Sequence, residues 1–273
     1  MNGKIKFECA IALLLILLDV FLTVKISQQN NGRESKSLNI STLSSATDQN
    51  ITVQVITKQY NKEGVEAEYP MLVSGGSEEQ LSRWNQIIEE DFNKILAIYS
   101  FHPITAPAKV PSNRTPTILR IKYEMKLNNE NYISILYTAS YNNPTSAHPT
   151  ELVYTTNINK SSSNRMKLSD VVILSEDFVK NFRTWEYISP FQENAEWNKA
   201  VKDYIANLSD EDLLLGFQNA DRIDSDNQMG IYSYLTEDRL GISLGVPNYI
   251  GDHAEFEGNY SDIKDYLQPD FKF

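Results

Sequence analysis

The chain has 273 residues, of which 41% are hydrophobic, and its formal net charge at pH 7 is -11. This length is sufficient for one large domain or two small ones, each with a hydrophobic core. A pI of about 4.8 means that the surface repels the phosphates of nucleic acids, so the composition argues against nucleic-acid binding.

An apolar stretch at residues 7–24 is the first organised feature of the chain. As a helix it spans about 27 Å, which is just enough to cross a bilayer. One carboxylate, Asp19, costs about 2.5–3.5 kcal/mol at mid-membrane, and the surrounding Leu, Ile, Phe and Val side chains outweigh that cost. No small-residue cleavage site follows, so we expect an uncleaved anchor rather than a removed secretory signal. The only cysteine, Cys9, lies in this stretch, which leaves the rest of the chain without a disulfide.

The N-terminal region therefore reads as a short cytoplasmic end and anchor, residues 1–25, followed by a stalk, residues 26–49. The stalk is rich in Ser and Asn and nearly without large apolar side chains, which is typical of a flexible linker. Basic residues flank the anchor on both sides and do not set its orientation. We expect a single-pass protein of the cell membrane. Residues 1–36 hold five basic and three acidic side chains, a balance of +2, so the remainder carries -13, which serves either solubility or a basic partner.

The first folded segment should be a strand pair followed by a long helix. Apolar residues alternate with polar ones from Ile51 to Val55, a turn contains Gly64, and a second strand runs to Pro70. Apolar residues at helical spacing then predict a helix over residues 77–99. Ser77 with Gln80 resembles a capping box at its start.

The remaining elements alternate between hairpins and helices. Proline-rich residues 101–116 are expected to be a loop. Strands are predicted at 117–127 with 131–141, at 151–159 with 165–173, at 230–246 as a hairpin around residues 236–238, and at 253–260; helices are predicted at 175–187, 193–207 and 261–267. This order lacks a regular βαβ alternation and indicates an α+β fold with mostly antiparallel sheets packed with helices. We expect two α+β subdomains, residues 50–162 and 163–273.

Common catalytic motifs do not occur in this sequence. It contains no Gly-rich phosphate loop, G-x-S-x-G elbow, C-x-x-C pair or H-E-x-x-H motif. We therefore expect no catalytic residues, no resident metal and no cofactor.

Several segments in a fixed order resemble one known family. They are EYPMLVSGG, the WNQIIEEDF helix, SAHPTELVYTTNIN, LSDVV and the closing YLTEDRLGISLGVPNYIGDHAEFEGNYSDIKDYL. Together they are similar to the extracytoplasmic domain pair, formally of unknown function, in the RsiV-type lysozyme-sensing anti-sigma factor. Related domains precede the catalytic domain of certain peptidoglycan deacetylases. The likeness covers residues 50–266, nearly all of the chain expected to be ordered.

The resemblance implies an α+β ectodomain outside a Gram-positive membrane that binds a ligand at the cell wall. In RsiV-type proteins that ligand is lysozyme, a basic protein, which suits an acidic ectodomain. Only Met1 to Lys6 precede the anchor and the chain ends at Phe273, so we expect the sensing or binding module alone, without an anti-sigma or deacetylase domain. The expected partners are a lysozyme-like basic protein or a peptidoglycan fragment, and the lipid bilayer through residues 7–24.

A candidate binding site lies in the stretch VPNYIGDHAEFEGNY, residues 246–260, which places a histidine among carboxylates. If residues 253–260 form a strand, Ala254 and Phe256 point to one face. His253, Glu255 and Glu257 then point to the other face, where a row of this kind could bind a ligand or a divalent metal, or supply a general base. The candidate ligand-binding residues are His148, Asp252, His253, Glu255 and Glu257.

Two other interpretations of these residues stay open. The simpler one is that His253, Glu255 and Glu257 are solvent-facing positions of a half-buried strand, with Asp252 as a turn residue. The other is a metal-assisted hydrolase of cell-wall polymer, which requires His148 and His253 to meet in one pocket with Asp252 and Glu255.

The remaining histidine and the tryptophans are expected to be structural. His102 precedes a proline in the predicted loop. Trp84, Trp185 and Trp197 fall in helical apolar patterns, so core packing is favoured over stacking on sugar rings.

Overall fold

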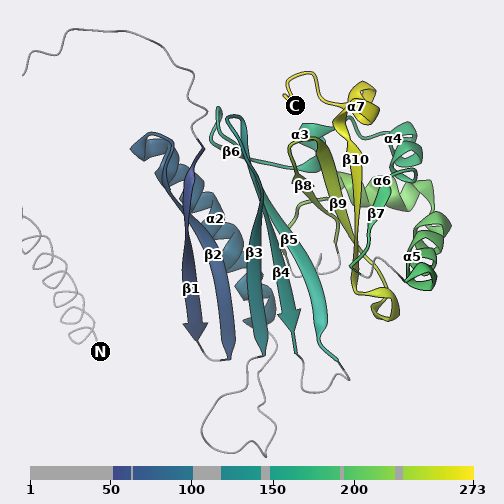
Figure 1. Ribbon diagram of the computed structural model, residues 1–273, viewed down its shortest axis with the longest axis horizontal. Helices are drawn as coiled ribbons and strands as arrows, with labels where there is room; N and C mark the ends of the chain where they lie inside the picture. Colours follow the sequence, from purple (N-terminus) through teal and green to yellow (C-terminus); the bar gives the residue numbers. More distant parts are fainter. Residues whose placement is uncertain (1–51, 63, 101–117, 143–147, 191–193, 225–229) are drawn as a thin grey trace, which may run out of the picture. The chain divides into compact units, whose positions relative to one another are not determined.

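The structure of the protein is a computed structural model (Figure 1). It describes residues 52–62, 64–100, 118–142, 148–190, 194–224 and 230–273. All of them belong to one compact unit, Gln49–Phe273. The predicted anchor, the predicted stalk and His102 lie outside the described residues. Within those ranges no helix combines the length and the apolar character needed to cross a membrane.

The larger sheet has six strands in the order β1-β2-β3-β4-β5-β6. Its neighbouring strands are antiparallel, apart from the parallel pair β2 and β3. The strands are β1 (Gln54–Lys62), β2 (Val65–Ser74), β3 (Leu119–Asn128), β4 (Tyr132–Tyr141), β5 (Thr150–Asn159) and β6 (Asn164–Met166). Helix α2 (Glu78–Ser100) lies along one face of this sheet (Figure 1).

The smaller sheet has four antiparallel strands in the order β7-β10-β9-β8. They are β7 (Glu186–Ile188), β8 (Tyr232–Leu235), β9 (Arg239–Gly245) and β10 (His253–Asn259). The helices of this half are α3 (Leu168–Val171), α4 (Glu176–Phe182), α5 (Ala195–Asn207), α6 (Asp210–Gln218) and α7 (Tyr260–Ile263), with short 3-10 turns η2 (Asn248–Ile250) and η3 (Lys264–Tyr266). The predicted α+β class with mostly antiparallel sheets is confirmed.

Helix α2 forms where its sequence predicts. The Ser77 N–H donates to Gln80 Oε1 at 3.0 Å, and the Gln80 N–H donates to Ser77 Oγ at 3.2 Å, which completes the expected capping box. Trp84, Ile87 and Ile95 are buried against the sheet. The helix therefore supplies one hydrophobic core of the molecule, together with apolar side chains of β3, β4 and β5.

Three predicted boundaries are wrong. Strand β2 continues past Pro70 to Ser74. A proline is tolerated there because β2 pairs with β3 only at Val65–Ala67, so no strand on that side needs a backbone N–H from residue 70. The strand expected at 165–173 ends at Met166, where Asp170 Oδ2 accepts a bond from the Lys167 N–H at 2.8 Å and opens helix α3.

The helix expected at 175–187 ends at Phe182. Arg183 leaves the helix, and its guanidinium donates to the carbonyls of Ile205 and Leu208 at 2.5 and 2.7 Å, capping the end of α5. Tyr187 consequently lies on strand β7, opposite Phe256 of β10. Helix α6 was not predicted, although Ser209 accepts a bond from the Asp212 N–H at 3.0 Å, a capping pattern that is visible in the sequence.

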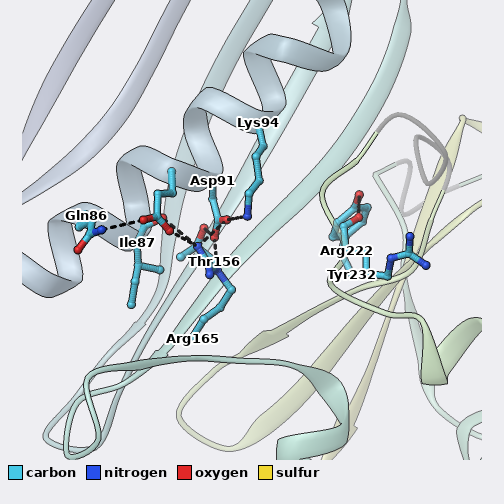
Figure 2. A network of polar contacts seen from close by, with 9 residues as sticks. Gln86, Ile87, Asp91, Lys94, Thr156, Arg165, Arg222 and Tyr232 are labelled. Atoms are coloured by element: carbon cyan, nitrogen blue, oxygen red, sulfur yellow. Dashed lines mark hydrogen bonds and ion pairs between the residues drawn. The ribbon is translucent and has the colours of Figure 1, made fainter.

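The central strand β5 carries polar contacts on both of its faces. On the α2 side, Thr156 Oγ1 donates to Asp91 Oδ2 at 3.0 Å, and Arg165 of β6 contacts Asp91 Oδ1 at 2.9 Å (Figure 2). Asp91 is only 1% exposed, so these bonds compensate its lost hydration. They tie the helix to the far end of the six-stranded sheet.

On the opposite face, β4 and β5 contact the smaller sheet. The Leu235 N–H donates to Ser134 Oγ at 2.9 Å, and Asn157 Nδ2 donates to the Ser233 carbonyl at 2.8 Å. Buried Asp221 accepts four bonds beside them, two from Ser233, one from Thr155 and one from the Leu168 N–H. The two sheets are thus joined by buried polar contacts as well as by apolar packing.

Candidate functional site

A cavity of about 420 Å³ lies where the smaller sheet meets the start of β5. Its aromatic wall is formed by Tyr187 of β7 and Trp197 of α5, and Trp197 Nε1 donates to the Tyr187 hydroxyl at 3.0 Å. The full lining is His148, Glu151, Tyr187, Ile188, Ser189, Pro190, Trp197, Asn248, Gly251, Asp252, His253, Ala254 and Glu255. This volume falls within the range of small-ligand sites in proteins.

The loop before β10 shapes one side of the cavity. Gly251 has φ +112 and Asp252 has φ +67, backbone conformations that favour glycine and that aspartate tolerates. A Cβ on Gly251 would lie 2.9 Å from the Trp197 ring, so the glycine permits the indole to close over the loop. The sequence pattern Gly-Asp therefore turns the chain sharply just before the strand that carries His253.

Asp252 links this loop to the larger sheet. Its Oδ2 accepts a bond from the Glu151 N–H of β5 at 2.9 Å, and its Oδ1 accepts one from Asn248 Nδ2 at 2.8 Å. Asn248 Nδ2 also lies 3.1 Å from His148 Nδ1. The interpretation of Asp252 as a turn residue is confirmed by its backbone, and its buried carboxylate in addition connects the two sheets.

His253 has an acceptor at each of its ring nitrogens. Nδ1 lies 3.1 Å from the Glu151 carbonyl oxygen, and Nε2 lies 3.6 Å from Glu255 Oε1. A neutral imidazole has only one N–H, whereas both nitrogens donate in the charged form. The Glu151 carbonyl therefore places a proton on Nδ1, and the Glu255 carboxylate beside Nε2 favours a second proton there.

The charges of the pair follow from this arrangement. Burial lowers the pKa of His253, but Glu255 and the Glu151 carbonyl together outweigh it and hold the pKa above its ordinary value. Burial likewise raises the pKa of Glu255, and the His253 cation and Lys126 outweigh it and hold that pKa below its ordinary value. The cavity wall therefore contains a His253–Glu255 pair in which each partner stabilises the charged form of the other.

The structure brings four of the five predicted site residues to one cavity: His148, Asp252, His253 and Glu255. The fifth, Glu257, is not among the lining residues and accepts a bond from the Tyr234 hydroxyl at 2.9 Å. The predicted alternation of side chains along β10 is confirmed, because Ala254 and Phe256 are buried in the hydrophobic core that the smaller sheet shares with helices α4, α5 and α6.

The interpretation of the other face as an open polar face is wrong. The side chains of His253, Glu255 and Glu257 are only 22%, 20% and 15% exposed. They are half-buried because this face of β10 lies against β5, and because the Tyr234 side chain of β8 reaches over Gly241 of β9 to Glu257.

Nine further lining residues were not predicted as site residues, and four of them carry polar or aromatic side chains central to the site: Glu151, Asn248, Tyr187 and Trp197. Glu151 and Asn248 come from segments more than 90 positions apart, and Tyr187 was assigned to a helix. Trp197 was expected in the core; it is half-buried and forms the cavity wall, while Trp84 and Trp185 are buried as expected. No local sequence pattern around a helical tryptophan distinguishes a position in the core from a position in the wall of a cavity.

No set of three metal-binding side chains is assembled within the described parts of the chain. His253 and Asp252 are also both engaged with protein partners, so neither presents a free donor pair to an ion. The arrangement can provide carboxylates, an aromatic wall and hydrogen-bonding groups to a ligand.

Comparisons with known proteins found no matching protein-family model and no matching curated sequence. Among solved structures, the chain is similar to a member of the DUF3298 family from Bacteroides fragilis NCTC 9343, with 12% identity, 81% of this chain and 96% of that chain covered, and a TM-score of 0.47. It is also similar to a DUF3298 family protein from Pseudomonas aeruginosa PAO1, with 11% identity, the same coverages of 81% and 96%, and a TM-score of 0.45. These structural neighbours thus belong to a family of unknown function.

Proposed function

We propose that this protein is a membrane-anchored, extracytoplasmic binding module that holds a cell-wall-associated or basic protein ligand, such as lysozyme, without catalysing a reaction. The observation that carries the proposal is the cavity at the junction of the sheets, in which the Trp197 and Tyr187 wall stands beside Glu151 and Glu255. Aromatic faces and carboxylates together suit a ligand with apolar and basic parts.

The electrostatics of the whole ectodomain support a basic partner. The chain beyond residue 36 carries a net charge of -13. This charge attracts a positively charged protein and accelerates its association, and added salt weakens that attraction. The side chain of Tyr249, between the lining residues Asn248 and Gly251, is 76% exposed. An exposed aromatic beside a cavity is a typical contact residue of a protein interface.

Calorimetric titration of the fragment 49–273 with lysozyme at two salt concentrations tests the proposal, with soluble peptidoglycan fragments titrated in parallel. We expect a binding heat with lysozyme whose affinity falls as salt rises. Substituting Trp197 with alanine should weaken this binding, whereas substituting the exposed residue Leu215 of α6, outside the cavity, should not. Absence of binding to both lysozyme and peptidoglycan fragments would refute the proposal.

A second candidate function, a metal-assisted hydrolase of cell-wall polymer, is favoured by one observation: His148 and His253 line the same cavity together with Asp252 and Glu255. Release of reducing ends from purified cell walls, measured with added zinc and with chelator, tests it. A zinc-dependent release that is lost on substitution of either histidine by alanine would establish the hydrolase and displace the binding module.

A further inference from the structure

The charges that line the cavity are of one predominant sign. Three carboxylates, those of Glu151, Asp252 and Glu255, face two imidazoles, and no lysine or arginine is present among the lining residues that the structure describes. A cavity of this composition repels anions and attracts cations. Peptidoglycan fragments carry carboxylates, so the lining favours a basic ligand over a wall fragment.

The three carboxylates differ in how far the protein already compensates them. Asp252 accepts two hydrogen bonds from the protein, at 2.9 and 2.8 Å. Glu151 uses its backbone N–H and carbonyl in the fold, while its carboxylate makes no hydrogen bond or ion pair to any residue that the structure describes. Glu255 is paired with His253 at 3.6 Å. The carboxylate of Glu151 is therefore available to an external cation, whereas a cation would share that of Glu255 with His253.

The aromatic wall adds a second contribution to cation binding. Tyr187 and Trp197 both line the cavity, and they are joined by a hydrogen bond of 3.0 Å from the indole to the phenol. An ammonium or guanidinium group over such a face is attracted by the quadrupole of the ring. The apolar side chains of Ile188, Pro190 and Ala254 complete a lining that matches the aliphatic stem of a long basic side chain.

We propose that the cavity is a recognition site for a single basic side chain of a partner protein, a lysine or an arginine, whose charged group meets Glu151 and Glu255 while its stem packs against Tyr187 and Trp197. This inference rests on the proposed function, because it specifies what the binding module recognises at this cavity.

The His253–Glu255 pair makes the site sensitive to pH. When His253 is protonated it occupies the Glu255 carboxylate, and when it loses its proton that carboxylate becomes available to the ligand. The groups facing His253 are Glu255 on its own strand and Glu151 of β5, with Asp252 adjacent in sequence. Ligand binding should therefore strengthen as the pH rises from 6 to 8, and by linkage the bound ligand should lower the pKa of His253.

The other groups around Glu255 come from three strands. They are Lys126 of β3, Tyr234 of β8 and Tyr187 of β7. Lys126 does not take the place of the ligand, because its ammonium lies 4.8 Å from the centre of the Tyr234 ring and 3.3 Å from Glu124 Oε2. Among the groups that contact Glu255, the imidazole of His253 is the one whose ordinary pKa lies near neutral pH, so it is the source of the expected pH dependence.

The experiment uses the full chain in detergent micelles with isotope-labelled histidine, since the protein has only three histidines. The probe is Nα-acetyl-L-lysine methylamide, and the matched controls are the norleucine and glutamate analogues, which replace the ammonium by a methyl group or a carboxylate. We expect the lysine probe to shift the His253 signal, to bind about tenfold more tightly than the norleucine analogue, and to bind at least about threefold more tightly at pH 8 than at pH 6. The glutamate analogue should not bind.

Variants separate recognition from a merely structural role. Glu151→Gln, which keeps every backbone bond of residue 151, and Glu255→Gln should each weaken binding of the lysine probe by about tenfold. His253→Gln should bind the lysine probe at pH 6 as tightly as the natural protein does at pH 8. Its affinity should be the same at both pH values. Glu257→Gln, on the same face of β10 but outside the cavity, is the matched control and should bind normally.

The outcomes distinguish this inference from the proposed function. Equal affinity for the lysine and norleucine probes, or normal binding by both Glu151→Gln and Glu255→Gln, overturns the cation site. If lysozyme binds while the lysine probe leaves the His253 signal unchanged, the binding module stands and this inference fails. If the lysine probe binds as expected and lysozyme does not, the cation site stands and the partner is a different basic protein.

Discussion

Substitution of Asp221 by asparagine should destabilise the junction between the two sheets. Oδ1 of Asp221 accepts bonds from the Ser233 N–H at 2.6 Å and Thr155 Oγ1 at 3.2 Å, and Oδ2 accepts bonds from the Leu168 N–H at 2.7 Å and Ser233 Oγ at 2.8 Å. Hydroxyl groups can rotate to other acceptors, whereas the two backbone N–H groups cannot. Whichever way the asparagine turns, its NH2 group faces one of those backbone donors.

The magnitude follows from this unmatched donor. A buried donor without an acceptor costs about 1–3 kcal/mol, and a hydrogen bond to a charged group contributes about 1.5–3 kcal/mol. We therefore expect the free energy of unfolding at pH 7 to fall by about 2–4 kcal/mol, a large part of the stability of a typical domain. Denaturant unfolding of the fragment 49–273, followed by tryptophan fluorescence, measures this difference.

The matched control is Asp224→Asn. Asp224 lies three residues further on, and its more exposed side chain accepts bonds from Arg222 at 2.9 and 3.1 Å. Exposed pairs of this kind contribute little, so the expected change is below about 1 kcal/mol. A loss for Asp221→Asn as small as that of the control would refute the account of the junction.

The pH dependence of the same comparison provides a second check. Burial raises the pKa of Asp221 to about 6 although the bonds from Ser233, Leu168 and Thr155 lower it. A carboxyl whose folded pKa is raised contributes stability that is fully present below its unfolded pKa of 3.8 and is lost as the pH rises through about 6. The advantage of the natural protein over Asp221→Asn should therefore grow by about 2 kcal/mol as the pH falls from 7 to 4.

Three further perturbations test other parts of the structure. Gly251→Ala should lower the free energy of unfolding by about 1–3 kcal/mol and lower the Tm in a thermal melt. The reason is that residue 251 has φ +112 and its new Cβ would lie 2.9 Å from the Trp197 ring. An unchanged Tm would contradict this close approach. His253→Gln should be less stable than the natural protein at pH 5.5 and comparable to it at pH 8.5. The pKa of His253 is raised in the folded protein, so its contribution to stability is lost as the pH rises through that pKa. A difference in the free energy of unfolding that is the same at both pH values, measured by denaturant unfolding, would exclude the ion pair. Deletion of residues 7–24 should move the protein from the membrane fraction to the soluble fraction on centrifugation, and retention in the membrane would remove the predicted anchor.

Local patterns were sufficient for most of the secondary structure. The capping box of Ser77 and Gln80, the apolar spacing behind it and the period-two alternation along β10 each act between residues close in sequence. Two of the errors lie where a distant residue intervenes. Helix α4 ends early where Arg183 caps α5, and strand β6 ends at Met166, where Lys167 bonds to Asp170 and Leu168 bonds to Asp221, 53 positions away.

The candidate site was predictable in its residue types and only partly in its membership. His148, Asp252, His253 and Glu255 were selected because polar and acidic residues gather around histidines in the sequence, and the structure brings them to one cavity. Glu151 belongs to the same cavity because the loop before β10 bonds to the start of β5, 101 positions earlier. No pattern within either segment encodes that pairing.

The sequence by itself determined that His253, Glu255 and Glu257 share a face of their strand, since successive side chains of a strand alternate between two faces. Only the tertiary structure decided what that face meets. The smaller sheet packs this face against β5 rather than exposing it, which half-buries the three side chains and pairs His253 with Glu255 at 3.6 Å. Side-chain alternation is a property of one strand, whereas burial and the charge of an imidazole depend on the partner strand, and that partner is chosen by packing across the whole fold.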